Sequence, residues 1–289
     1  MALLPHDSIP NHRPASATGN FVDAGGLKLH YLDYGTTGGL PMLCIHGGAA
    51  HAHWFDFVAA GFTADYHVRA LDLRGHGNSE WTDPPEYGYK LYASDIANVV
   101  EKLALHDFVL VGHSMGGIAA LVYAATHPGR VGKLVIVDST MHMGVANVAG
   151  LRDMGARDGG RYTSREELVA RYRLLPSGTV AAPHVVRHVA EQSGRQHDDG
   201  TWRHKFDRNM YATFERLDAM PFWNGIRVPA LLIKGDRSER ITPEIYAEVK
   251  ARCPQAELME VAHSDHHVTL DNPSGFEQAL KTFLARHSR

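Results

Sequence analysis

The segment from Phe108 to Pro128 constrains the fold more than any other, because it contains no Asp, Glu, Lys or Arg. Its length reaches that of a membrane-spanning helix. However, its centre is interrupted by Gly112, His113, Ser114, Gly116 and Gly117. The residues before this interruption favour a strand, and those after it favour a helix. The sequence therefore predicts a buried strand, a sharp turn and a buried helix, and no transmembrane segment.

Short apolar runs alternate with stretches of helix length along most of the chain. The runs are residues 41–45, 68–72, 108–111, 134–137 and 230–233, and the helix-length stretches are residues 52–61, 89–105, 115–127, 243–252 and 273–286. Such runs are typical of strands buried on both faces of a parallel sheet. Their alternation with helices predicts a doubly wound α/β architecture. Residues 21–34 predict an edge hairpin that turns at Gly25-Gly26.

The alternation stops between Ser139 and Asp218, and this break predicts the domain organisation. The stretch is rich in arginine and lacks a buried strand, but residues 165–175, 183–193 and 208–217 are compatible with helices. A structureless loop of this length is improbable in a compact domain. We therefore expect a helical lid over residues 139–218, an α/β core formed by residues 21–138 and 219–289, and a flexible leader over residues 1–20.

Composition excludes several classes of protein. The formal net charge is −3, and no cluster of five or more Lys and Arg is present, which argues against nucleic-acid binding. The N-terminus lacks the pattern of a secretory signal. Cys44 and Cys253 suggest neither a disulfide framework nor a zinc site, as expected of a cytoplasmic protein. We expect a small-molecule substrate; the oligomeric state stays open, a homodimer included.

The 20 histidines raise the question of a metal site. His51 and His53 form half of a two-metal HxHxDH motif, but Asp56 stands one position late and the motif is not completed. We therefore expect no metal and no cofactor.

Gly112-His113-Ser114-Met115-Gly116 carries the strongest chemical signal. A serine flanked by glycines two positions away, between a buried strand and a helix, is the pattern of a nucleophile elbow. Small residues allow the tight turn that presents the serine hydroxyl, and the helix N-terminus offers unpaired N–H groups to an anion.

Three further motifs follow in a fixed order: His46-Gly47-Gly48, the segment from Asp72 to Ser79, and the segment from His266 to Pro273. With these motifs and the elbow, the chain resembles the α/β-hydrolase fold family from about Phe21 to the C-terminus. The resemblance implies that a histidine held by an acid activates Ser114. It also implies that the backbone N–H groups of Gly48 and Met115 bind the oxyanion.

The resemblance selects His266 as the base, because the family places this histidine seven residues before the proline of the last helix, here Pro273. His263 and His267 are then surface or supporting residues.

The acid has two candidate locations, because Ser238 occupies its usual place. Either the acid is Asp236 or Glu239, next to the usual position, or it is Asp138, at the end of the strand that follows the elbow. The second arrangement is similar to that of certain small bacterial esterases and acetamidomethylene-succinate hydrolases, and we favour it.

These residues together imply a serine hydrolase that cleaves a small carboxylic ester through an acyl-enzyme on Ser114. The alternatives are hydrolysis of an amide, enamide, lactone or carbon–carbon bond in a carboxylate-bearing molecule, a perhydrolase activity, and a non-catalytic ligand receptor on the same fold. Candidate substrate-binding residues are His53, Trp54, Met141, Trp202 and Tyr211. Arg187 or Arg171 would pair with a substrate carboxylate if its side chain faced inward.

Overall fold

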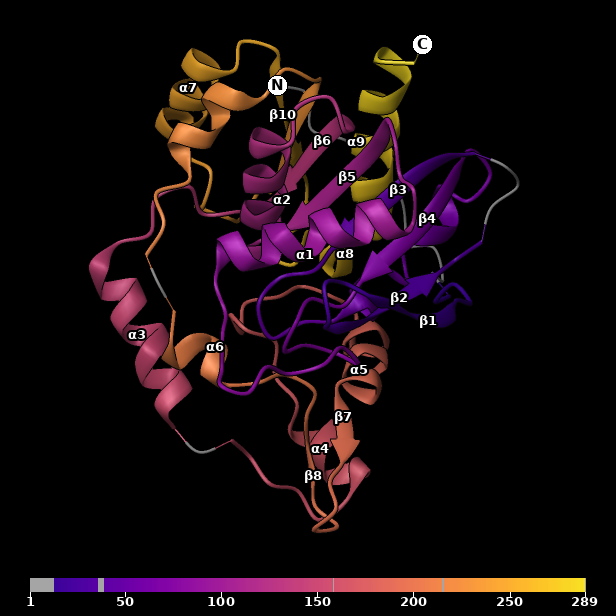
Figure 1. Cartoon of the computed structure of the whole chain (residues 1–289), viewed down its shortest axis with the longest axis vertical. Coiled ribbons are helices and arrows are strands. Elements are labelled where there is room, and N and C mark those ends of the chain that lie inside the picture. Colours follow the sequence, from indigo (N-terminus) through magenta and orange to yellow (C-terminus); the bar gives the residue numbers. More distant parts are fainter. Residues whose placement is uncertain (1–12, 36–38, 158, 215, 289) are drawn as a thin grey trace.

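A twisted sheet of eight strands forms the centre of the computed structural model (Figure 1), which describes residues 13–35, 39–157, 159–214 and 216–288. The strands lie in the order β1-β2-β4-β3-β5-β6-β9-β10. They are β1 (Thr18–Asp23), β2 (Lys28–Asp33), β3 (Leu40–Ile45), β4 (Tyr66–Leu71), β5 (Phe108–His113), β6 (Val131–Val137), β9 (Ala230–Gly235) and β10 (Ala256–Val261). The β1–β2 and β2–β4 pairs are antiparallel, and every other pair in this sheet is parallel. The predicted edge hairpin and the mostly parallel sheet are confirmed, although β1 begins at Thr18, inside the predicted leader.

Helices cover both faces of the sheet, which confirms the doubly wound α/β fold. On one face lie α1 (Tyr89–Lys102), α2 (Met115–Thr126) and α7 (Pro243–Arg252), and on the other lies α9 (Pro273–Arg286). Two hydrophobic layers of the core lie on opposite faces of the sheet, and successive strand residues point into them in turn. Leu43 packs in the layer of α1 and α2, whereas Cys44 packs in the layer of α9. The expected helix over residues 52–61 is instead two short 3₁₀ turns, η1 (Ala52–Phe55) and η2 (Ala59–Gly61).

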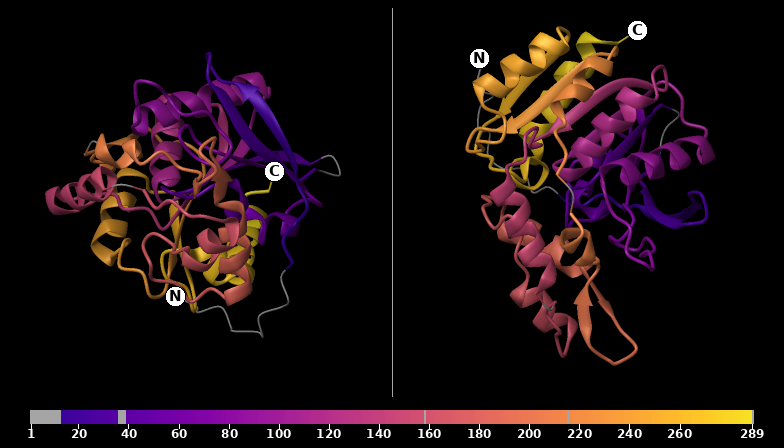
Figure 2. Two further views of the ribbon diagram at one scale, coloured as in Figure 1. Left: turned by 90° about the horizontal axis from the view of Figure 1, so that it is seen from below. Right: turned by 60° about the vertical axis from the view of Figure 1, so that its left-hand side comes forward.

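Residues 139–218, which we call the lid segment, lie beyond the carboxyl ends of the central strands (Figures 1 and 2). Their elements are α3 (Val145–Ala156), α4 (Arg165–Arg171), α5 (Pro183–Gln192), β7 (Gly194–Gln196), β8 (Trp202–His204) and α6 (Asn209–Ala212). The turn η3 (Met220–Gly225) then leads back to β9. The helices expected over residues 165–175 and 208–217 are therefore shorter than predicted. The sequence did not predict helix α3 or the β7–β8 hairpin.

No helix in the described ranges of the chain is long and apolar enough to cross a membrane. The charge-free segment folds as β5, a turn at Ser114 and α2, as the sequence predicted.

Candidate active site

Ser114 occupies a sharp turn between β5 and α2. Its φ of 53° and ψ of −119° lie outside the regions that L-residues favour. The chain can turn here because two flanking positions are glycine: a Cβ on Gly112 would lie 2.5 Å from the Gly116 carbonyl oxygen, and one on Gly116 would lie 2.2 Å from that of His46. The Ser114 N–H donates to the Val137 carbonyl at 2.9 Å and thereby ties the turn to β6.

His266 and Asp138 complete a chain of contacts that begins at Ser114. His266 Nε2 lies 3.0 Å from Ser114 Oγ, and His266 Nδ1 lies 2.7 Å from Asp138 Oδ2. His266 follows β10, and its carbonyl oxygen lies 2.8 Å from His113 Nε2. The arrangement is that of a nucleophile, a base and an orienting acid.

The alternative acid, Asp236, is placed elsewhere. Its Oδ1 accepts a hydrogen bond of 2.9 Å from the Ser264 N–H. Ser238, in the usual place of the acid, donates to Asp138 Oδ2 at 2.8 Å. The structure thus brings Asp138, and not Asp236, to His266.

Burial governs the electrostatics of this group. Burial raises the pKa of Asp138 to about 7, although the hydrogen bond from Ser238 and the charge of Arg240 oppose the rise. Asp138 Oδ1 is buried and has no hydrogen-bond partner among the described residues. Burial and the nearby charge of Arg240 lower the pKa of His266 well below its ordinary value. A neutral His266 at pH 7 can accept the proton of Ser114.

Gly48 and Met115, the predicted oxyanion donors, both line the cavity beside Ser114. A Cβ on Gly48 would lie 2.8 Å from the Tyr211 hydroxyl, so a larger residue there would require the Tyr211 side chain to shift. The loop that carries Gly48 is braced by two buried histidines. His46 Nε2 accepts from the Leu73 N–H at 3.0 Å, and His76 Nε2 accepts from the Ala49 N–H at 3.3 Å.

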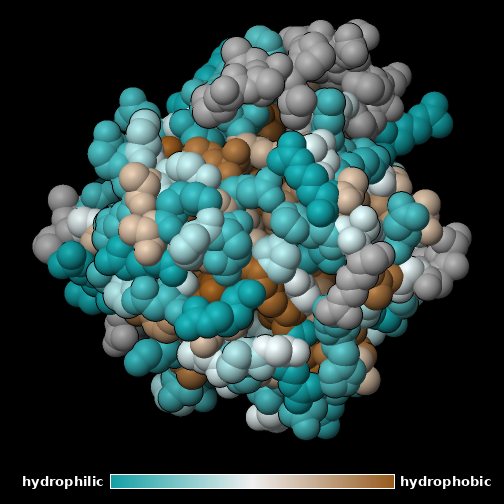
Figure 3. All heavy atoms as spheres, turned by 90° about the horizontal axis from the view of Figure 1, so that it is seen from above, coloured by the Kyte–Doolittle hydropathy of each residue, from teal (hydrophilic) through white to brown (hydrophobic). Residues whose placement is uncertain are grey.

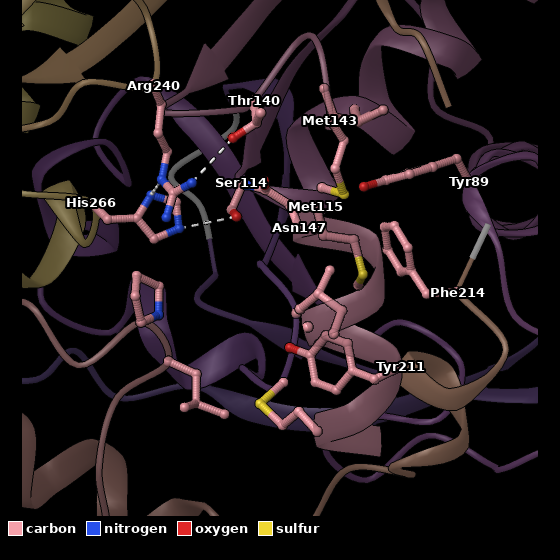
Figure 4. A pocket seen from close by; sticks show the side chains of 17 residues that line it. Tyr89, Ser114, Met115, Thr140, Met143, Asn147, Tyr211, Phe214, Arg240 and His266 are labelled. Atoms are coloured by element: carbon pink, nitrogen blue, oxygen red, sulfur yellow. Dashed lines mark hydrogen bonds between the residues drawn. The ribbon is translucent and has the colours of Figure 1, made fainter. Parts of the chain in front are cut away.

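The cavity next to Ser114 has a volume of about 350 Å³ and extends from Arg240 and His266 to Tyr89 and Phe214 (Figure 4). Both the core and the lid segment line it, and most of the lining is apolar. The apolar and aromatic lining residues are Tyr89, Met115, Ile118, Met143, Leu151, Met154, Leu175, Pro176, Tyr211 and Phe214. The polar ones include Thr140, Asn147 and Arg240.

Of the candidate substrate-binding residues, the structure brings Tyr211 to the cavity and places the others away from it. Trp54 packs behind the site, with its ring centroid 5.1 Å from that of His267. Met141 is buried against Trp223, at 3.4 Å from its indole nitrogen. His53 contacts Asp56 at 2.9 Å, and Trp202 belongs to the β7–β8 hairpin.

Arg187 and Arg171, the candidates for pairing with a substrate carboxylate, do not line the cavity. The Arg187 side chain is 75% exposed and pairs with Glu191, and that of Arg171 is 67% exposed and pairs with Glu167. Both pairs join residues one turn apart on exposed helix faces, where charged side chains remain hydrated.

Sequence reasoning missed Arg240 and the residues of α3 that line the cavity. One feature of the sequence could have pointed to Arg240, since it stands two residues after Ser238, which occupies the usual place of the acid. The sequence of α3 gives little indication of its role, because its apolar residues form no distinct face.

Two groups of side chains in the described part of the chain bring three potential metal ligands together. His113, His266 and His267 form the first, in which His266 already contacts Ser114 and Asp138. The second consists of His53, Asp56 and His188, in which Asp56 Oδ2 lies within hydrogen-bond distance of both histidines.

Curated relatives align with nearly the whole chain. A 2-(acetamidomethylene)succinate hydrolase from Mesorhizobium japonicum is 27% identical over 91% of this chain and 94% of its own length. The esterase Rv0045c from Mycobacterium tuberculosis is 28% identical over 84% of this chain and 82% of its own. The crystal structure of an E-2-(acetamidomethylene)succinate hydrolase superimposes with a TM-score of 0.80 at 23% identity, covering 93% of this chain and 100% of the other.

The family comparison agrees with the architecture and with the order of the motifs. Residues 41–273 match the family described as "alpha/beta hydrolase fold", a range that contains Gly48, Ser114, Asp138 and His266. The chain therefore belongs to the α/β-hydrolase fold family.

Proposed function

We propose that this hydrolase is a serine hydrolase that cleaves a small carboxylic ester through an acyl-enzyme on Ser114. The observation that carries the proposal is the continuous contact from Ser114 Oγ through His266 to Asp138, at 3.0 and 2.7 Å, on the wall of a cavity.

The first half of the reaction forms the acyl-enzyme. His266 Nε2 takes the proton of Ser114 as Oγ attacks the ester carbon, and the carbonyl electron pair moves onto its oxygen. The N–H groups of Gly48 and Met115 bind this oxyanion, and the loss of one such donor costs about 3 kcal/mol of transition-state stabilisation. Collapse of the intermediate breaks the bond to the alcohol oxygen, which takes the proton from His266.

The second half releases the acid. Water gives a proton to His266 and attacks the acyl carbon, and the new intermediate expels Ser114 Oγ, which regains its proton. Asp138 holds His266 in place and stabilises its protonated form in both halves. The cavity of about 350 Å³ lies near the lower end of the range of ligand pockets, roughly 300–1,000 Å³, which fits a small substrate.

A second candidate is hydrolysis of an amide or enamide that carries a carboxylate. The named activity of the M. japonicum relative, which acts on a substituted succinate, favours it. Lactone or carbon–carbon bond hydrolysis and a non-catalytic receptor role use the same fold, so a panel of ester, amide and lactone substrates discriminates among them.

We also propose a cytoplasmic location, because both cysteines are buried free thiols.

Labelling with a fluorophosphonate probe tests the proposal. We expect the native protein to be labelled and to hydrolyse short p-nitrophenyl esters, and Ser114→Ala to lose both properties. The exposed Ser94 provides a matched control, and Ser94→Ala should keep both. An unlabelled native protein without ester turnover from pH 6 to 9 would contradict the proposal.

A further inference from the structure

Arg240 is the one Arg, Lys, Asp or Glu among the described residues that line the cavity. It lies in the loop after β9, and its side chain is 34% exposed. Figure 4 shows its guanidinium beside the His266 ring, at the end of the cavity opposite Tyr89 and Phe214. We call this the polar end of the cavity. A positive charge in a largely apolar cavity favours a ligand with a negative charge.

The contacts of the guanidinium leave donors available to a ligand. Nε lies 2.8 Å from His266 Nδ1 and 3.5 Å from Asp138 Oδ2, and Nη1 donates to Thr140 Oγ1 at 3.1 Å. Nη2 takes part in none of these contacts. A guanidinium has five N–H donors, and its planar shape suits a carboxylate, which it can bind through two parallel hydrogen bonds.

The contact between Arg240 and His266 also conflicts with catalysis. Nδ1 of a neutral imidazole either carries a proton and donates a hydrogen bond, or lacks the proton and accepts a hydrogen bond. The triad requires a proton on Nδ1, directed at Asp138, so that Nε2 is free to accept from Ser114. The N–H of Arg240 Nε then points at another N–H group across 2.8 Å. An anion that drew the guanidinium away from His266 would remove this conflict.

We infer that Arg240 is a specificity-determining residue that binds a carboxylate of the substrate at the polar end of the cavity. This inference rests on the proposed function, because it assigns a substrate class to the same site. Arg240 contacts His266, and His266 contacts Ser114 Oγ, so the bound carboxylate lies close to the scissile bond. The substrate is therefore a half-ester of a short dicarboxylic acid, or a molecule of the same charge and size.

Two esters of the same shape test the charge preference. Monoethyl succinate carries a carboxylate where ethyl 4-methylpentanoate carries an uncharged isopropyl group. We expect the native enzyme to prefer the half-ester at least about tenfold in kcat/KM, which equals 1.4 kcal/mol. In Arg240→Gln this ratio should fall to about one, mainly through a higher KM for the half-ester, whereas Arg240→Lys should retain part of it. The exposed Arg187 provides the matched control, and Arg187→Gln should keep the native ratio. An unchanged ratio in Arg240→Gln would overturn the inference.

A binding measurement covers the case in which turnover of either ester is too slow to compare. Succinate should slow fluorophosphonate labelling of Ser114 in the native enzyme and not in Arg240→Gln. Equal protection of both proteins, or protection of neither, would overturn the inference. A native protein that the probe does not label contradicts the proposed function itself, whereas a labelled enzyme without a preference for anions contradicts the role of Arg240 alone.

Discussion

At the residue scale, the order of the strands explains how Asp138, the proposed acid, comes to lie beside His266. β6 and β9 are neighbours in the sheet, and Val137 pairs with Ile233. Their carboxyl ends therefore lie side by side, and a carboxylate after either strand can approach the same histidine. In this chain Asp138, after β6, makes the contact, and Ser238, after β9, donates a hydrogen bond to it.

Substitution of the two candidate acids distinguishes their roles. Asp138→Asn should lower kcat by about 10⁴-fold, because an amide neither holds the required tautomer of His266 nor stabilises its charge. Asp236→Asn should stay within about tenfold of the native enzyme, since its contact is with the Ser264 backbone. Ester hydrolysis by the two purified variants, with circular dichroism as the control for folding, measures this difference. The reverse order of losses would move the acid to the loop after β9.

The pH dependence of kcat/KM should report the ionisation of Asp138. In the proposed mechanism the active form has an ionised Asp138 and a neutral His266, and burial raises the pKa of Asp138 to about 7. Activity should therefore rise with pH through about 7. Ser238→Ala removes a hydrogen bond that favours the ionised carboxyl, so the rise should move to higher pH. A rise at unchanged or lower pH in this variant would contradict the assignment.

At the scale of elements, the sequence predicted those with a strong periodic or local signal. β5, the elbow and α2 were predictable because a fully apolar strand, a glycine-flanked serine and an apolar helix follow one another. β10 was not, because its sequence, Ala256-Glu257-Leu258-Met259-Glu260-Val261, mixes charged and apolar residues in an edge strand that is half-buried. The lining of the cavity was also beyond prediction, because it depends on how α3 packs against the core.

A cluster of polar side chains joins the lid segment to the core at α5. The buried Asp56 accepts a hydrogen bond of 2.6 Å from the Tyr34 hydroxyl, and its Oδ2 lies 2.9 Å from His53 Nδ1 and 2.7 Å from His188 Nε2. His188 belongs to α5, whereas the other three residues belong to the core. Burial opposes ionisation of Asp56, but the hydrogen bonds from His188 and His53 outweigh it and lower the pKa of the carboxyl. The carboxylate therefore links α5 to the core.

Removal of this carboxylate should loosen the lid segment. Asp56→Ala leaves the Tyr34 hydroxyl and two imidazoles without their acceptor, and we expect it to lower the free energy of unfolding by about 3 kcal/mol at pH 7. Urea unfolding measures the loss, and limited proteolysis should show faster cleavage near α5. Asp153→Ala changes an exposed aspartate of the lid segment and provides the control. A loss below about 1 kcal/mol would show that apolar packing alone holds α5.

At the scale of the whole molecule, the site lies where the order of the strands reverses. β3 lies between β4 and β5, so the chain leaves β3 toward one side for β4 and later returns to its other side for β5. The loops after β3 and β5, which carry Gly48 and Ser114, therefore diverge at this edge and open a crevice between them. The lid segment covers the same edge (Figure 2). The face turned away from it is mainly hydrophilic, with small separate hydrophobic areas (Figure 3).

The central sheet couples the two hydrophobic layers of the core, because its strands contribute side chains to both. β5 places Leu110 in the layer of α1 and α2 and Val111 in the layer of α9. Neither layer can be exposed without disrupting strands that the other layer needs. We therefore expect the two layers to unfold in one transition, and the two cysteines provide a probe for each.

Cys44, on β3, lies in the layer of α9, and Cys253, after α7, lies in the other layer. Burial raises the pKa of both thiols, so neither should react with a thiol reagent in the native protein. In Cys253→Ser and Cys44→Ala, each of which retains one thiol, reactivity should appear at the urea concentration at which that variant loses its circular dichroism signal. Labelling of one thiol well before this transition would show that its layer opens alone. The sheet would then fail to couple the layers, and the core would unfold through an intermediate.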